Sequence, residues 1–396
     1  MIFNAKAIAF CGALLSFLPF QPNAQGVRTT LDNGVRFAAV DSSFSLALRF
    51  RVQSRVGFYH FSGPDSDVQE FDLRVRRMRL RFEGFLLNPK FSYHVQLSFS
   101  RADQDWDVSN VPNVLRDAMI WYGINQGFTI GIGQGKLPGN RQRVISSGEQ
   151  QFADRSIVNN MLTLDRDVGI FVNYASDKGY LAYRVKTAVT AGEGRNALPS
   201  DKGLAYTARL ELLPLGPFSE RSDYFEGDLL HEPRPKLSAA GTLHFNESAK
   251  RTGGELGPFL YEPRDLFSIH LDLLFKYNGW ALSSEYLKRS SDKPKTFDND
   301  LNFRYVYAGQ GINTQFSYCT RQMWELALRH SYLEPQRDLY DVELKKMQYG
   351  ICLGKYLNKH RVKVQTDLTY EHLKNPATTT GAGSGFQWRF QVEMGI

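Results

Sequence analysis

Hydrophobic and polar residues alternate along most of the chain. In "FSLALRFRVQSRVGF" (44–58), every second residue from Phe44 to Val52 is apolar, and the opposite face carries Arg49, Arg51 and Arg55. Alternation with a period of two predicts a β-strand with one apolar and one polar face. The pattern recurs at 91–100, 266–277, 323–332, 360–372 and 386–396. The predicted fold class is therefore all-β.

About sixteen such strands can be placed, and many are about ten residues long, the length of a tilted transmembrane strand. Their predicted ranges are 44–58, 71–84, 91–100, 115–124, 127–135, 167–175, 180–190, 203–213, 236–246, 265–277, 279–289, 312–318, 323–333, 342–356, 360–372 and 386–396. A further short strand is expected within 302–309.

The connections alternate between long and short. The long ones are 59–70, 101–114, 136–166, 191–202, 247–264, 290–311, 334–341 and 373–385, and the short ones include 125–126, 176–179, 278–279, 319–322 and 357–360. Short periplasmic turns and long extracellular loops are typical of an antiparallel outer-membrane β-barrel. One connection, 214–235, is long where a short turn is expected, and its prolines exclude a regular strand.

The segment "DLRVRRMRLRFEG" (72–84) allows two interpretations. A basic arm that binds nucleic acid is one, but such arms lack a regular apolar residue at every second position. In a barrel, the arginines line the aqueous lumen and the apolar residues contact lipid. The apolar phase changes at Arg76 and Arg77, which predicts a β-bulge there.

The N-terminus has the pattern of a secretory signal: Lys6, a short apolar run at 7–18, and small residues before Gln25. We expect a signal peptide at 1–24, an N-terminal periplasmic lead at 25–43 and the barrel at 44–396. A membrane anchor is the alternative, but the apolar run is too short to span a bilayer. The expected location is the outer membrane of a Gram-negative bacterium after cleavage.

Composition adds little candidate chemistry. The chain has 396 residues, a formal net charge of +7 and 13% aromatic residues, which favour β structure. After signal cleavage two cysteines remain, Cys319 and Cys352, too few for a disulfide framework and without metal-site spacing. No cofactor is expected. An outer-membrane hydrolase is the enzyme alternative, but no local pattern around His270 and Asp272 marks an activated nucleophile.

The block "GQGKLPGNRQRVISSGEQQFADRSIVNNMLTLDRDVGIFV" (133–172) resembles the family of phosphate-selective porins O and P. The matching positions are Gly133, Gln134, Lys136 and Pro138, then Arg141, Arg143, Ser146 and Ser147, then Asp154, Arg155 and Ser156, and finally Arg166, Asp167 and Gly169. Weaker similarities lie at 76–86, 183–194, 208–216 and 324–335.

The resemblance implies a sixteen-stranded barrel, usually a homotrimer, with the third long loop folded into the pore. It also implies selectivity for anions, in some members for phosphate or pyrophosphate. Expected partners are small anionic or polar solutes, outer-membrane lipid and, for the terminal strand 386–396, the barrel-assembly machinery. No nucleic-acid partner is expected.

The longest connection, 136–166, is the natural constriction of such a pore, because rings of Arg and Lys favour anions. Its cations are Lys136, Arg141, Arg143, Arg155 and Arg166. Strand phase places Arg49, Arg51, Arg55, Arg77, Arg79, Arg81, Arg184 and Lys186 on the lumen side, and Arg361 and Lys363 extend this wall. Two alternatives stay open. The arginines pair with lumen carboxylates and only hold the loop in place, or the pore is a weakly selective general porin.

Overall fold

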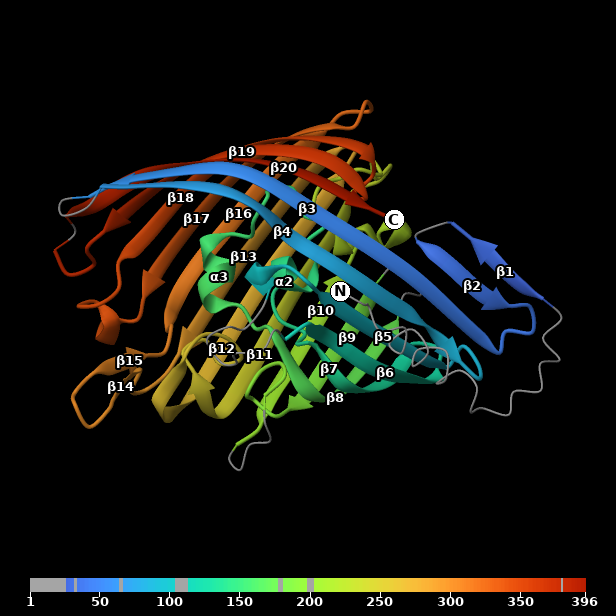
Figure 1. The fold of residues 1–396 in the computed structure, drawn as a ribbon, viewed down its shortest axis with the longest axis horizontal. Helices are drawn as coiled ribbons and strands as arrows, with labels where there is room; N and C mark the ends of the chain where they lie inside the picture. Colours follow the sequence, from blue (N-terminus) through green and yellow to red (C-terminus); the bar gives the residue numbers. More distant parts are fainter. Residues whose placement is uncertain are drawn as a thin grey trace, which may run out of the picture.

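The computed structural model describes residues 26–31, 34–63, 67–103, 113–176, 181–197, 203–378 and 380–396. Within these residues, sixteen antiparallel strands form a closed barrel, as Figure 1 shows. The barrel closes where its last strand pairs with its first, with Phe390 opposite Val56. Its strands are β3 (Phe44–Ser62), β4 (Asp67–Leu86), β5 (Phe91–Ser98), β6 (Leu115–Asn125), β7 (Phe128–Lys136), β8 (Arg166–Ser176), β9 (Ala182–Thr190), β10 (Ala205–Leu213), β11 (Lys236–Arg251), β12 (Phe259–Tyr277), β13 (Trp280–Ser290), β16 (Gly309–Cys319), β17 (Trp324–Pro335), β18 (Lys345–Asn358), β19 (Val362–Lys374) and β20 (Gly381–Gly395). The predicted fold class is confirmed.

The two faces of the barrel wall differ as the alternation predicted. In β10, Arg209 and Glu211 are buried on the lumen side, whereas Tyr206, Leu210 and Leu212 are exposed on the outer side. Lipid can cover the outer residues, and the closed ladder pairs the backbone groups of each strand. No helix in the described part of the chain is long and apolar enough to cross a membrane. The helices α2 (Arg141–Val144) and α3 (Ile157–Leu162) are short.

Several predicted connections were wrong because the strands continue through them. β3 and β4 stay paired beyond residue 58, with Phe61 opposite Val68, so most of the predicted loop 59–70 is strand. Likewise β11 and β12 extend into 247–264, and β20 begins at Gly381 rather than at 386. Outside the hydrocarbon the ladder persists without a strict apolar face, so periodicity does not mark where it ends.

The long connections carry small elements of their own. The expected short strand within 302–309 is β15 (Phe303–Tyr305), which pairs with β14 (Lys295–Phe297) in a hairpin apart from the barrel. Short 3-10 segments occur at η1 (Arg101–Asp103), η2 (Ser219–Tyr224) and η3 (Arg337–Leu339), and η2 is kinked at Glu220 and Arg221.

A β-bulge lies where the arginine doublet predicted it. Gln53 pairs with Arg77 and Ser54 pairs with Val75, so Arg76 has no partner residue on β3. The extra residue changes the phase of β4. As a result the adjacent Arg76 and Arg77 both reach a carboxylate inside the barrel.

The residues before the barrel form a hairpin, β1 (Val27–Thr30) and β2 (Val35–Ala39), within the predicted lead 25–43. β2 pairs with β3 from Val35 opposite Leu48 to Ala38 opposite Ser45. β20 ends opposite Arg51, so β2 covers the edge of β3 that β20 leaves unpaired. The predicted signal peptide, 1–24, lies outside the described residues.

Candidate functional site

The connection 137–165, called the inner loop here, crosses the lumen between β7 and β8. Its backbone carbonyls accept hydrogen bonds from cations on widely separated strands: Arg209 on β10 binds Gly139 at 2.8 Å, Arg289 on β13 binds Thr163 at 2.7 Å, and Lys363 on β19 binds Gln150 at 2.6 Å. These bonds come from several sides of the wall. They fix the loop across the lumen, where Figure 1 shows α2 and α3 inside the ring of strands.

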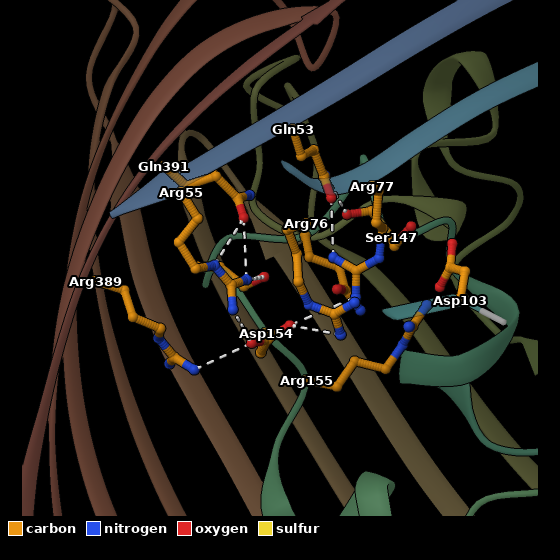
Figure 2. A network of polar contacts seen from close by, with 12 residues as sticks. Gln53, Arg55, Arg76, Arg77, Asp103, Ser147, Asp154, Arg155, Arg389 and Gln391 are labelled. Atoms are coloured by element: carbon orange, nitrogen blue, oxygen red, sulfur yellow. Dashed lines mark hydrogen bonds and ion pairs between the residues drawn. The ribbon is translucent and has the colours of Figure 1, made fainter. Parts of the chain in front are cut away.

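Asp154 of the inner loop holds the loop to the β3–β4–β20 wall. Its carboxylate lies 2.5 Å from Arg55 and 3.4 Å from each of Arg76, Arg77 and Arg389 (Figure 2). Burial by itself raises the pKa of Asp154, but the four guanidinium groups hold this pKa well below its ordinary value. Asp154 is therefore ionised at neutral pH, at the centre of an arginine cluster.

The opposite wall is acidic, and the inner loop meets it with Arg141. Arg141 donates to Asp272 at 2.9 Å and to Ser238 at 2.7 Å. Beside it, the backbone N–H of Gln142 donates to Glu285 at 2.6 Å. The inner loop thus places the carboxylate of Asp154 against the basic wall and the guanidinium group of Arg141 against the acidic wall.

The other predicted loop cations also have protein partners. Arg155 donates to the carbonyl of Gln142 at 2.8 Å, and Lys136 donates to that of Val144 at 3.2 Å. Arg143 forms an ion pair with Asp165, and Arg166 binds Asp165 at 3.1 Å and Asp117 at 2.8 Å. Arg143 and Arg166 thus hold the loop through carboxylates, whereas Arg155 and Lys136 hold it through backbone carbonyls.

The unexpected connection 214–235, called the turn-end connection here, folds into the lumen from the end with the short turns. The backbone N–H of Glu226 donates to the carbonyl of Glu149 at 2.9 Å, and the Glu226 carboxylate accepts from the backbone N–H of Gln151 at 2.8 Å. Lys276 on β12 donates to the carbonyls of Ser222 and Phe225 at 2.6 and 2.9 Å. Sequence reasoning noted this connection's length but did not place it in the lumen.

Two adjoining cavities of about 160 and 1080 Å³ remain beside these segments. Arg49, Arg81, Glu149, His360 and Arg361 line both. Together the cavities are lined by the cations Arg49, Arg51, Arg79, Arg81, Lys186, Arg221, Lys359 and Arg361, and by the carboxylates Glu83, Glu149, Glu220 and Glu393. Cations outnumber carboxylates on this open surface.

Pairing reduces but does not cancel this charge. Glu83 serves two guanidinium groups, Arg49 at 2.7 Å and Arg81 at 2.6 Å. Arg79 binds Asp103 at 2.6 Å, and Arg51 lies 3.6 Å from Glu393.

The predicted cations of β9 and β19 also form ion pairs. Arg184 forms an ion pair with Asp223, and Lys186 lies 3.0 Å from Glu211. Lys363 lies 3.6 Å from Glu393.

Other candidate chemistry finds no support. Cys319 and Cys352 are free and buried, and the described residues contain no cluster of three His, Cys, Asp or Glu side chains that could hold a metal. Asp272, considered as a partner for His270, instead binds Arg141 and Arg209 at 2.9 and 2.6 Å.

The closed barrel of sixteen antiparallel strands is similar in fold to solved outer-membrane porins and channels. The family model described as phosphate-selective porin O and P matches residues 46–224, which confirms the resemblance over that part of the chain. Similar solved structures include Pseudomonas putida OprB at high pH (8% identity, TM-score 0.54, covering 90% of this chain and 95% of that one). The outer membrane channel DcaP of Acinetobacter baumannii is also similar (10%, 0.52, 90% and 99%), as is the trimer form of Vibrio cholerae OmpT (12%, 0.50, 88% and 99%).

These identities are low, so the solved structures establish the fold alone. No match was found among curated proteins. The family match and the fold together support an outer-membrane channel rather than an enzyme.

Proposed function

We propose that this protein is an outer-membrane porin through which small hydrophilic solutes diffuse passively, with a preference for anions. The observation that carries the anion preference is the lining of the open lumen. The smaller cavity is lined by Arg49, Arg51, Arg79 and Arg81 of β3 and β4, and the larger one by Arg49 and Arg81. In contrast, Asp272 and Glu285 on the acidic wall are buried beneath the inner loop and bind its residues.

A permeating anion therefore meets mostly guanidinium groups on this surface. Guanidinium groups stay charged at every physiological pH and offer paired donors that match carboxylate and phosphate oxygens. The position of the arginines on the open side and of the acids beneath the loop affects selectivity more than the net charge of the lumen does. In a water-filled lumen an isolated charge acts over only about 8 Å at physiological salt. In this proposal the inner-loop cations fix the loop that narrows the pore, and the β3–β4 cations give the pore its preference for anions.

Phosphate is one of the proposed anions, supported by the family match over 46–224. A homotrimer is also proposed, since one similar structure, OmpT, is described in a trimer form. The apolar outer wall, with residues such as Leu210 and Leu271 exposed, supports both lipid contact and subunit contact.

Single-channel recording in a planar bilayer tests the proposal. We expect discrete conductance steps, a reversal potential of anion sign in a KCl gradient, and a lower conductance when phosphate is added. Steps without selectivity would indicate a general porin, for which the carboxylates Glu83, Glu149, Glu220 and Glu393 provide the charge balance. Folded protein that gives no steps would contradict the pore itself.

A further inference from the structure

The turn-end connection gives the larger cavity an apolar side. It is lined by Tyr224, the last residue of η2, and by Phe225, Leu229 and Leu230 of the segment that follows. Leu229 is buried, whereas the other three are half-buried and keep part of their surface toward open space. Apolar side chains in contact with water are unfavourable, and the passage of inorganic ions alone does not require them. Their exposure in the cavity therefore favours a solute with an apolar group.

Phe225 is held in a fixed position. His360 packs against its ring at a centroid distance of 5.4 Å, and the Lys276 ammonium lies 4.3 Å from the ring centroid. The Lys276 ammonium also binds the carbonyl of Phe225 at 2.9 Å. The Phe225 ring, although it belongs to a connection, is thus held against Lys276 of β12 and against His360.

Cations surround the same apolar surface. Arg221 and Lys186 lie 5.3 and 4.7 Å from the centroid of the Tyr224 ring. Across the cavity, Arg49 and Arg81 share the single carboxylate of Glu83, and the Nε atom of each is buried without a hydrogen-bond partner among the described residues.

The backbone that carries Arg221 is strained. Glu220 and Arg221 have φ angles of 49° and 55°, so two consecutive residues other than glycine adopt the left-handed conformation. Strain of this kind persists where the surrounding structure enforces it, commonly at ligand sites. Here it accompanies the placement of a guanidinium group over the Tyr224 ring.

We propose that the larger cavity is a binding site for organic anions that carry one ring-sized apolar group. The anionic group binds beside Arg49 and Arg81, and the ring packs on Phe225, Tyr224 and Leu230. The inference rests on the proposed porin function and deepens it, because it assigns this cavity to aromatic carboxylates or sulfonates as a further class of solute beside the inorganic anions.

The test compares benzoate with acetate, which share a carboxylate and differ in the ring. Each is added at constant ionic strength to single channels of the full-length protein in KCl. We expect benzoate to halve the conductance at about one tenth of the acetate concentration, the ratio that partial burial of one ring supports. In Phe225→Ala and in Leu230→Ala, benzoate and acetate should halve the conductance at similar concentrations. Leu271→Ala, on the lipid-facing side, is the matched control and should leave the ratio as it is.

The outcomes separate the two proposals. An anion-signed reversal potential with equal effects of benzoate and acetate would overturn the ring-binding site and leave the porin function standing. A reversal potential without anion preference would overturn the proposed selectivity whatever benzoate does. If Phe225→Ala fails to fold, the test rests on Leu230→Ala, because this substitution removes a smaller side chain than Phe225→Ala does. An unchanged ratio in that variant contradicts the site.

Discussion

The backbone N–H of Glu226 donates a 2.9 Å hydrogen bond to the carbonyl oxygen of Glu149. The two residues belong to segments that enter the lumen from opposite ends of the barrel, the turn-end connection and the inner loop. Their contact means that the free cross-section of the pore is set by both segments. The open space left beside them runs along the arginines of β3 and β4.

Shortening the turn-end connection should widen the pore. We expect replacement of residues 217–232 by a short turn to raise the single-channel conductance roughly twofold, because conductance follows the open cross-section. β10 and β11 remain paired in the wall, from Ala205 opposite Asn246 to Leu212 opposite Ala239, so the barrel should still close. Far-UV circular dichroism checks that it does. An unchanged conductance from a folded barrel would show that this segment lies outside the conduction path.

Removing the charge of Glu149 should strengthen the anion preference. Glu149 lines both cavities, and no ion pair joins it to a described residue. We expect Glu149→Gln to raise the chloride-to-potassium permeability ratio about twofold, the effect of one charge at about 8 Å in water. Glu262→Gln is the matched control, since Glu262 is exposed and pairs with Arg264 at 2.8 Å. Equal shifts in both variants would argue against a selective role for the cavities.

Asp154→Asn should loosen the inner loop. The change leaves Arg55, Arg76, Arg77 and Arg389 without their shared carboxylate, and loss of one partner from a buried ion-pair cluster costs about 3 kcal/mol. We expect a lower midpoint of thermal unfolding in detergent and a noisier open-channel current. Asp298→Asn, in an exposed loop, should change neither. A quiet current with an unchanged midpoint would mean that the backbone hydrogen bonds alone hold the loop.

The depressed pKa of Asp154 also predicts a pH dependence. A carboxylate whose pKa is lower in the folded than in the unfolded protein stabilises the fold fully above its ordinary pKa, about 4. This stabilisation is lost as the pH falls through the folded value. The difference in unfolding midpoint between the native protein and Asp154→Asn should stay constant from about pH 8 to 5 and shrink below about pH 4. A difference that shrinks between pH 7 and 5 would show that the arginines do not hold the carboxylate ionised.

The sequence by itself determined the barrel and the orientation of its strands. A strand between lipid and water needs apolar residues on one face and polar residues on the other, so the environment is encoded in a period of two. The same logic located the bulge, because two adjacent inward arginines, Arg76 and Arg77, require one extra residue in the ladder. The block 133–172 carried the family resemblance.

Only the tertiary structure decided what the lumen charges do. Arg141 and Arg81 look alike in sequence, yet Arg141 is buried in ion pairs with the acidic wall and Arg81 lines both cavities. The inward path of 214–235 was equally hidden, since it depends on bonds to Glu149, Gln151 and Lys276, residues distant in the chain. Alternation records which side of the wall a residue faces. The alternation does not predict which segment folds against that side, because this depends on contacts between residues far apart in the sequence.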